Sequence, residues 1–205
     1  GTLLDREAAA SHDITVRATS SDGSFNTALM TIGLNDIDEF DVGAVTDSDA
    51  ATNIVNENAA NGTVVGVTAL ASDGDATNNT ITYTLDDDAG GRFTINSSTG
   101  VVTVADGTLL DREAAASHDI TIRATSAEGS ASTATMTIAL NDIDEFDVGS
   151  VSDSDVTTNA VDENAANGTV VGVTALASDA DATKSTITYT LDDDAGGRFT
   201  INSST

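Results

Sequence analysis

The sequence predicts an all-β protein made of repeated antiparallel β-sandwiches, and three observations lead to that prediction. Apolar and polar residues alternate in short runs, as in strands with one buried and one solvated face. Clusters of Gly, Asn, Asp and Ser separate these runs every 8 to 15 residues, which is typical of turns in a sandwich. Long stretches of sequence also recur at a fixed offset, so the sandwich is expected as a tandem repeat.

The repeat has a period of 106 residues. The string LLDREAAASHDIT begins at Leu3 and again at Leu109. This period is too long for one turn of a solenoid and typical of a domain. We therefore expect residues 1–39 to be the last part of one repeat with its linker, 40–145 to be a complete domain with its linker, and 146–205 to be the first part of the next repeat.

Individual strands follow from the alternation. In the run 80–85 three apolar side chains are expected to point inward and three threonines outward, and the run 120–124 has the same pattern. An alanine-rich stretch after Asp111 predicts only one capped turn, because it is too short for a stable helix. Further strands are expected at 63–67, 93–95, 101–104 and 136–140.

The chain is strongly acidic, since 34 Asp and Glu residues against 7 Lys and Arg residues give a net charge of −27. Such a polyanion repels phosphate backbones and anionic lipid, so nucleic acid and membrane surfaces are not expected partners. Apolar runs such as Val64-Val65 are far too short for membrane insertion. The absence of Cys excludes thiolate nucleophiles and zinc–thiolate sites. Cations are the natural partners.

The carboxylates occur in pairs that suit a hard cation. Residues two apart on an extended chain point to the same side, so Asp111 with Glu113, and Asp179 with Asp181, can each offer two oxygens to one ion. Carboxylates brought within about 5 Å repel one another, and Ca²⁺, which takes six to eight oxygen ligands, would offset this repulsion. The alternative is a solvated acidic face that binds no metal.

A series of motifs from Glu57 to Phe146 resembles a cadherin-type extracellular repeat. In order, the motifs are Glu-Asn, Asn-Gly-Thr, Asp-x-Asp, Phe-x-Ile, Thr-Gly-x-Val, Leu-Asp-Arg-Glu, and Asn-Asp before a terminal Phe. The most specific signal is Leu-Asp-Arg-Glu followed about 30 residues later by Asn-Asp. The sequence is most similar to the bacterial variety found in large, repeats-in-toxin-like surface adhesins. The resemblance implies an Ig-like, cadherin-like sandwich in an extracellular protein at the cell surface.

In that family Ca²⁺ lies at the junctions between successive domains, and the resemblance implies two sets of ligands here. The set at the second junction comprises Glu57, Asp111, Glu113, Asn141, Asp142, the carbonyl of Ile143, Asp179 and Asp181. The set at the first junction comprises the matching residues Asp5, Glu7, Asn35, Asp36, Asp73 and Asp75.

Two positions depart from the family pattern. The family usually has an acid after the strand that ends at Ala124, where this chain has Ser126 followed by Glu128. The outermost ion of each junction is therefore expected to be weak or missing. The linker lacks the family's proline and has Asp144 and Glu145 in that region, which either add ligands or are simply hydrated.

The function implied by the resemblance is a calcium-dependent spacer in a bacterial surface adhesin, with Ca²⁺ stiffening the junctions between neighbouring repeats. The alternative is a calcium-dependent carbohydrate-binding module that takes a polysaccharide or another cell-surface ligand. With 5 Phe, 2 Tyr and no Trp, aromatic platforms for a sugar are scarce.

An enzyme is not expected. Ser117, His118 and Asp119 are adjacent, and neighbours on a strand point to opposite faces, so they cannot form a catalytic relay. Four further acidic groups are expected to be solvated and to bind no metal: 86–88, 192–194, Asp47 with Asp49, and Asp153 with Asp155.

The two end units are expected to complement each other in all but one strand, the equivalent of residues 101–104. Prepared on its own, the chain is therefore expected to associate head to tail by strand complementation between copies.

Overall fold

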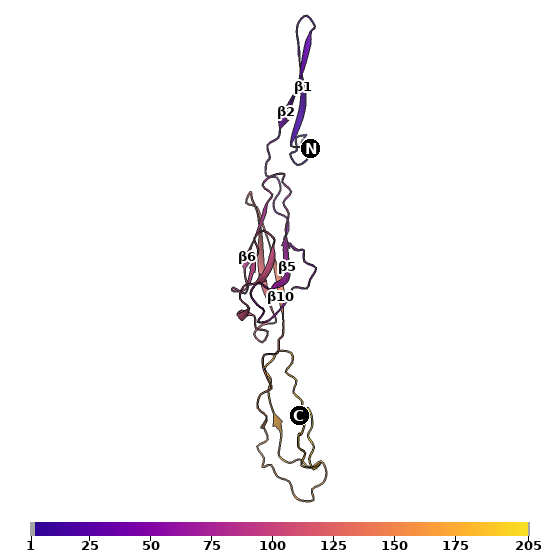
Figure 1. Ribbon diagram of the computed structural model, residues 1–205, viewed down its shortest axis with the longest axis vertical. Coiled ribbons are helices and arrows are strands. Elements are labelled where there is room, and N and C mark those ends of the chain that lie inside the picture. The colour runs from indigo at the N-terminus through magenta and orange to yellow at the C-terminus, as the bar shows by residue number, and fades with distance from the viewer. Residues whose placement is uncertain (1–2, 205) are drawn as a thin grey trace.

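The computed structural model describes residues 3–204 as an elongated rod with three segments along its axis (Figure 1). The N-terminal segment (3–39) is a long hairpin, residues 40–145 contain a central sandwich, and the C-terminal segment (146–204) lies beyond it. The N-terminal segment meets the sandwich at the first junction, and the sandwich meets the C-terminal segment at the second. Within residues 3–204 no helix has the length and apolar character that a membrane crossing needs.

Two four-stranded sheets form the central sandwich. Its strands are β3 (Thr46–Asp47), β4 (Ile54–Asn56), β5 (Val64–Leu70), β6 (Ile81–Asp87), β7 (Phe93–Ile95), β8 (Val101–Val104), β9 (Ser117–Ser126) and β10 (Ala131–Asn141). One sheet has the order β4-β10-β9-β6 and the other β3-β5-β8-β7. β4 pairs parallel with β10, whereas the other described pairings are antiparallel. The first two strands of the sandwich thus belong to different sheets, β3 to one and β4 to the other.

Side-chain alternation along the strands builds the core between the sheets. In β9, Ile120 and Ile122 are fully buried while Thr121 between them stays partly exposed. In β6, Tyr83 is buried and Ile81 and Leu85 pack against the core, as the sequence analysis predicted. The prediction of an antiparallel β-sandwich is confirmed, because apolar residues at every second position give each sheet one face to bury.

The predicted strands occur, some with extended bounds. β7 and β8 have the expected limits, and β10 begins at Ala131 because it pairs along nearly all of β9. The 3₁₀ turn η1 (Gly107–Leu109) was not predicted from the sequence; here the side chain of Asp106 accepts a hydrogen bond from the amide of Thr108. Asp111 caps the following turn as expected, accepting a bond from the Ala114 amide at 2.8 Å.

The connection from β7 to β8 requires a glycine. The Asn96 side chain accepts hydrogen bonds from the amides of Ser98 and Thr99, both at 3.0 Å, and Gly100 then turns the chain with a φ of +72°. A Cβ at this position would lie 2.2 Å from the Ala69 carbonyl oxygen. Only glycine meets both conditions without strain.

The end segments have the elements of the repeat without its complete core. β1 (Ser11–Thr19) and β2 (Phe25–Gly33) match β9 and β10 at the repeat offset, yet Ile14, Val16 and Ile32 remain exposed. In the C-terminal segment β11 (Ser152–Asp153) pairs with β12 (Ala175–Leu176). β12 matches only the end of β5, because the sequence holds no second copy of β8 to pair with the rest.

Candidate metal centre

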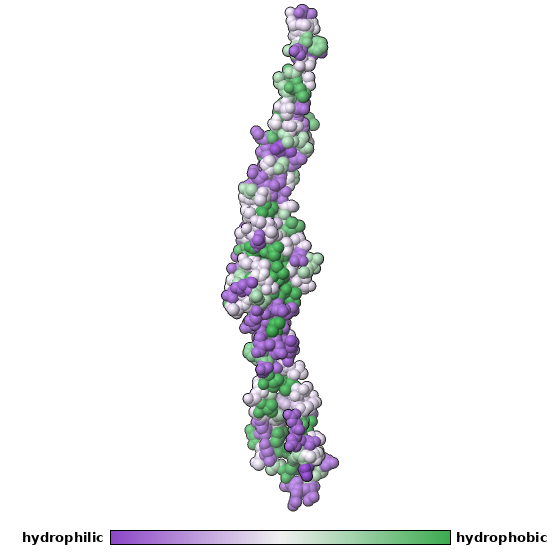
Figure 2. All heavy atoms as spheres, viewed as in Figure 1, coloured by the Kyte–Doolittle hydropathy of each residue, from purple (hydrophilic) through white to green (hydrophobic). Residues whose placement is uncertain are grey.

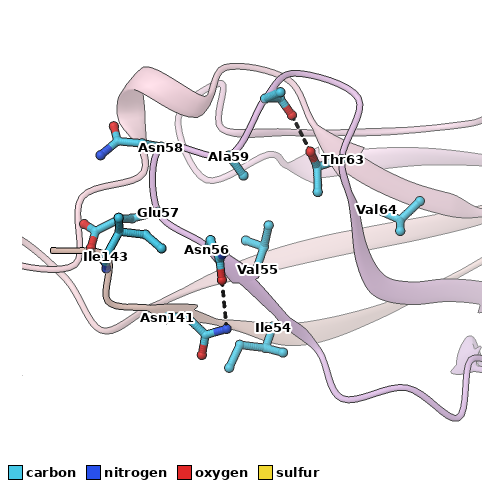
Figure 3. A pocket seen from close by; sticks show the side chains of 11 residues that line it. Ile54, Val55, Asn56, Glu57, Asn58, Ala59, Thr63, Val64, Asn141 and Ile143 are labelled. Carbon is cyan, nitrogen blue, oxygen red and sulfur yellow. Dashed lines mark hydrogen bonds between the residues drawn. The ribbon is translucent and has the colours of Figure 1, made fainter. Parts of the chain in front are cut away.

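Acidic side chains from three parts of the chain meet at the second junction. Glu57 follows β4, Glu113 lies in the turn after η1, and Asp142 follows β10; one oxygen of each lies within 4.8 Å of the others. The parallel pairing of β4 with β10 produces this meeting, since it places the Glu57 amide 3.1 Å from the Asn141 carbonyl oxygen. The side chains of Asn141 and Asn56 continue the pairing with a 3.0 Å hydrogen bond (Figure 3).

Glu57 is a buried carboxylate held by backbone amides. Its side chain is 2% exposed, Oε1 accepts a hydrogen bond from the Ile143 amide at 2.7 Å, and Oε2 accepts one from the Arg112 amide at 2.5 Å. An open groove of about 580 Å³ runs along β4 and the loop that follows it. Glu57 and Ile143 lie side by side in its lining (Figure 3). These amides orient the carboxylate, but a buried charge remains costly unless an opposite charge accompanies it.

Backbone amides of the C-terminal segment bind the acids of the central sandwich directly. The Ala182 amide donates to Oε1 of Glu113 at 2.8 Å. The Thr183 amide donates to Oδ2 of Asp142 at 3.1 Å, and the Thr183 hydroxyl donates to the same oxygen. The acids therefore lie between two segments that are far apart in the sequence.

The C-terminal segment contributes its own buried acid. Asp181 is 4% exposed, and one of its oxygens lies within 4.8 Å of oxygens of Glu113 and Glu145. Oδ1 of Asp181 accepts a hydrogen bond from the Glu145 amide at 3.1 Å. The second junction thus has two overlapping acidic clusters that share Glu113.

The first junction repeats this arrangement. Glu7, Asp36 and Glu39 bring oxygens within 4.8 Å of one another. The Ala76 amide donates to Glu7 at 3.1 Å and the Thr77 amide donates to Asp36 at 3.0 Å, as their copies do at the second junction. Because both copies make the same contacts, the geometry is a property of the repeat.

A further cluster at the first junction contains Asp38, Asp75 and Glu128. Asp75 is 3% exposed, and its Oδ1 accepts a hydrogen bond from the Glu39 amide at 3.2 Å. Glu128 comes from the turn between β9 and β10, which lies beside Asp38 of the first linker. Figure 2 shows hydrophilic residues gathered at both junctions of the rod.

The clusters have the size of a calcium coordination sphere. Ca–O distances of 2.3–2.6 Å place two opposite ligands about 4.6–5.2 Å apart, and the oxygens of each cluster lie within 4.8 Å of one another. Carboxylates are the hard oxygen donors that this ion prefers. The donor set of each junction therefore fits Ca²⁺ in chemistry and in size.

Five buried carboxylate oxygens at the junctions have no hydrogen-bond partner among the described residues. Among residues 3–204, the ion pair formed is that of Arg123 with Asp86, on the β6–β9 ladder, and no Lys or Arg pairs with the junction acids. The buried carboxylate oxygens without a hydrogen-bond partner all belong to the two junctions: Asp36 Oδ1, Asp73 Oδ2, Asp75 Oδ2, Asp142 Oδ1 and Asp181 Oδ2.

The acids of one junction differ in their electrostatic surroundings. Donation by a threonine hydroxyl, the largest effect, lowers the pKa of Asp36 and of Asp142. Burial, followed by the negative charge of neighbouring acids, raises the pKa of Glu39, Glu145 and Asp38. Like charges are thus crowded at each junction, and a divalent cation would relieve that crowding.

Seven of the expected ligands enter these clusters: Glu7, Asp36, Asp75, Glu57, Glu113, Asp142 and Asp181. Two others, Asp5 and Asp111, each cap a local turn by accepting an amide hydrogen bond. Asp73 and Asp179 accept the amides of the acids two residues later. The last three lie in or beside the linkers: the exposed Asn35, Asn141 at the end of β10, and Ile143, whose amide binds Glu57.

Four acids in the clusters were not among the expected ligands. Glu39 and Glu145 occupy matching positions of the two linkers, so the repeat itself was a signal that could have identified them. Asp38 was equally accessible to that reasoning, because it lies in the first linker. Glu128 was noted in the sequence as the acid that follows Ser126, but its approach to Asp38 depends on the folded sandwich.

The acidic loops outside the junctions take part in local structure. Asp87 and Asp88 accept amide hydrogen bonds within the β6–β7 turn, and Asp47 accepts a hydrogen bond from the amide of Thr68 at 3.0 Å.

His118, in β9, forms no catalytic relay with its neighbours in the sequence. Its Nε2 atom has no hydrogen-bond partner among the described residues, and its ring centre lies 6.4 Å from that of Phe93. Burial lowers the pKa of this histidine.

Comparisons with known proteins agree with this geometry. Residues 51–141 match the Cadherin domain family. Human Protocadherin Fat 1 is 31% identical over 201 residues, which are 97% of this chain and 4% of that protein. The crystal structure of mouse Cadherin-23 EC22-24 has a TM-score of 0.73 at 26% identity and covers 98% of this chain, which spans 64% of that one.

A second solved structure, the Protocadherin gammaB7 EC3-6 cis-dimer, has a TM-score of 0.74 at 20% identity, a likeness that shows the fold alone. It covers 100% of this chain, which spans 51% of that one. The chain therefore spans a small part of the human relative and less than two thirds of either solved structure.

The facing sheets and the acidic junctions define a class of modular β-sandwich proteins with candidate metal sites between successive units. Within this class, the central unit is a cadherin-type domain. Cadherin domains are extracellular, generally calcium-dependent adhesion modules, and they are not enzymes.

Proposed function

We propose that the chain is a calcium-dependent structural spacer, in which Ca²⁺ at each junction holds neighbouring units in a rigid line. One observation carries this proposal: at both junctions, carboxylate oxygens are buried without any partner in the described protein. The unit before, the linker and the unit after each contribute an acid to one cluster, namely Glu113, Glu145 and Asp181. An ion bound to all three must restrain the two units relative to each other.

The proposal assigns the two ligand sets by junction and the three units by residue range. Residues 1–39, 40–145 and 146–205 are proposed as successive parts of the repeat. The acids that cluster are proposed as direct ligands, while Asp5, Asp111, Asp73 and Asp179 retain an oxygen that is not used in capping. Asn35, Asn141 and the carbonyl of Ile143 are proposed to complete the coordination.

The proposed setting is the outer surface of a bacterium, in a large adhesin whose many repeats carry a binding domain away from the cell. The sequence motifs and the near identity of the two copies support this setting. Repetition favours a mechanical role, because length increases with every copy of a unit that contacts only its neighbours.

Calcium titration combined with solution scattering tests the function. We expect isothermal titration of Ca²⁺ into the 205-residue chain to release or absorb heat with a stoichiometry of at least one ion per junction. Small-angle X-ray scattering should show a larger maximum dimension and a stiffer chain in Ca²⁺ than in chelator. A chain that gives no heat and scatters identically in both buffers would contradict the proposal.

The carbohydrate-binding alternative has little support in the central sandwich. Within residues 46–141 the aromatic side chains are Tyr83 and Phe93, and both are buried, so neither offers a platform for a sugar ring. A calcium-dependent signal on a glycan array from this chain would favour the alternative over the spacer.

Association between copies is a separate proposal for the 205-residue chain prepared on its own. Ile14, Val16 and Ile32 of the N-terminal hairpin are exposed. Their copies Ile120, Ile122 and Ile138 are buried. A C-terminal segment of another copy has strands that match β3 and β5 and could cover this face. Size-exclusion chromatography in Ca²⁺ should show a mass that increases with concentration, and a constant monomer would refute this association.

A further inference from the structure

We propose that Glu128 is a calcium ligand at the first junction, where it completes an ion position with Asp38 and Asp75. The inference rests on the proposed function, because it takes Ca²⁺ as the ion at the junctions. It changes the expectation for the first junction, where Ser126 replaces the acid that the family usually has. On this proposal Glu128, two residues after Ser126, supplies the carboxylate that the family usually has at the position of Ser126.

The position of Glu128 is set by the turn between β9 and β10. The amide of Ser126 donates to the Ser130 carbonyl at 3.0 Å and the amide of Gly129 donates to the Ser126 carbonyl at 3.1 Å, which closes a tight loop. Gly129 has a φ of +109°, a conformation that favours glycine. The loop is therefore fixed at both ends, and Glu128 projects from it at a defined point.

Two hydroxyl groups then orient the carboxylate. Ser126 donates to Oε2 of Glu128, and Ser130 donates to Oε1 at 2.6 Å. The Ser130 oxygen also accepts a hydrogen bond from the amide of Val42 at 3.0 Å, which ties the turn to the linker that carries Asp38. The side chain is half-buried and held in place, as a preorganised ligand should be.

The cluster that Glu128 joins has an unmet requirement for positive charge. One oxygen each of Asp38, Asp75 and Glu128 lies within 4.8 Å of the other two. Asp75 is 3% exposed, and in the described part of the chain its Oδ2 is buried with no hydrogen-bond partner. Three carboxylates that converge around a buried, unpartnered oxygen match the donor set of a hard divalent cation.

The matching turn of the N-terminal segment, between β1 and β2, contains an acid that makes only local hydrogen bonds. Asp22 stands at the same position of the repeat, and its Oδ1 accepts hydrogen bonds from the amide and the hydroxyl of Ser24 at 2.9 and 2.7 Å. Asp22 therefore caps its own turn, whereas Glu128 has a longer side chain and lies against acids of two other segments. The same position thus supplies both a test residue and a matched control.

The test is calcium titration of three versions of the full 205-residue chain: wild type, Glu128→Gln and Asp22→Asn. Both substitutions remove one negative charge from equivalent turns and keep nearly the same shape. We expect Glu128→Gln to lose one ion from the wild-type stoichiometry, or to weaken one site by roughly 10-fold or more. Asp22→Asn should bind like the wild type, and all three should melt at the same temperature in chelator.

The outcomes separate this inference from the function on which it rests. If the wild type binds Ca²⁺ and Glu128→Gln keeps its full stoichiometry and affinities, Glu128 is not a ligand and the proposed function is unaffected. An equal loss in Glu128→Gln and Asp22→Asn would also overturn the inference, because it would reflect net charge. A wild type that binds no Ca²⁺ would overturn both proposals.

Discussion

Calcium should raise the melting temperature of the central sandwich. An ion that binds only the folded chain with a dissociation constant of about 10⁻⁴ M, at about 100 times that concentration, adds roughly 2.7 kcal/mol. For a domain of roughly 100 residues, 1 kcal/mol shifts the melting temperature by about 4–8 °C. One ion bound in the clusters that flank the sandwich is therefore expected to give a rise of about 10–20 °C, and a second ion should add to it.

The assay is thermal unfolding followed by far-UV circular dichroism or calorimetry, in about 10 mM CaCl₂ and in chelator. NaCl at equal ionic strength is the control, because monovalent salt screens exposed charges but does not join several carboxylates. The reasoning is refuted if the two melting temperatures agree within error, or if NaCl alone produces the same rise as CaCl₂. Either result would mean that the clustered acids are simply solvated.

Three further predictions concern single substitutions, and two of them have a matched control substitution. Asp142→Asn keeps an acceptor for Thr183 but should weaken calcium binding roughly 10-fold or more, whereas Asp87→Asn, in a surface turn, should bind like the wild type in the same titration. Phe93→Ala, at a core position 2% exposed, should lower the free energy of unfolding by about 3–5 kcal/mol in urea; a loss below about 1 kcal/mol would contradict the core described above. Gly100→Ala should cost about 1–3 kcal/mol, while alanine at Gly33, where a Cβ would meet nothing within 4 Å, should leave stability nearly unchanged.

Local patterns account for the parts of the fold that the sequence predicted. Alternating residues placed Ile120 and Ile122 in the core because successive side chains of a strand point to opposite faces. The capped turn after Asp111 followed from a hydrogen bond that spans only three residues. In each case the interacting groups lie close together in the sequence, so their arrangement can be predicted without the tertiary structure.

The residues that form the acidic clusters could be predicted only in part from the sequence. Same-side spacing indicated that Asp179 and Asp181 act as a pair, but it could not show that Asp181 is buried beside Glu113 and Glu145. Those contacts arise when the C-terminal segment meets the end of the sandwich, and the residues are more than 30 positions apart in the sequence.

By itself, then, the sequence determined the repeat, the strand faces, the excess of negative charge and the preference for a hard cation, because these depend on residue type and on neighbours along the chain. Only the tertiary structure decided which acids converge. The parallel pairing of β4 with β10 placed Glu57 beside the second linker, and the β9–β10 turn placed Glu128 near Asp38, which lies 90 residues earlier in the chain. A metal centre depends on distances of a few ångströms between oxygens, and those distances exist only once the sheets have packed.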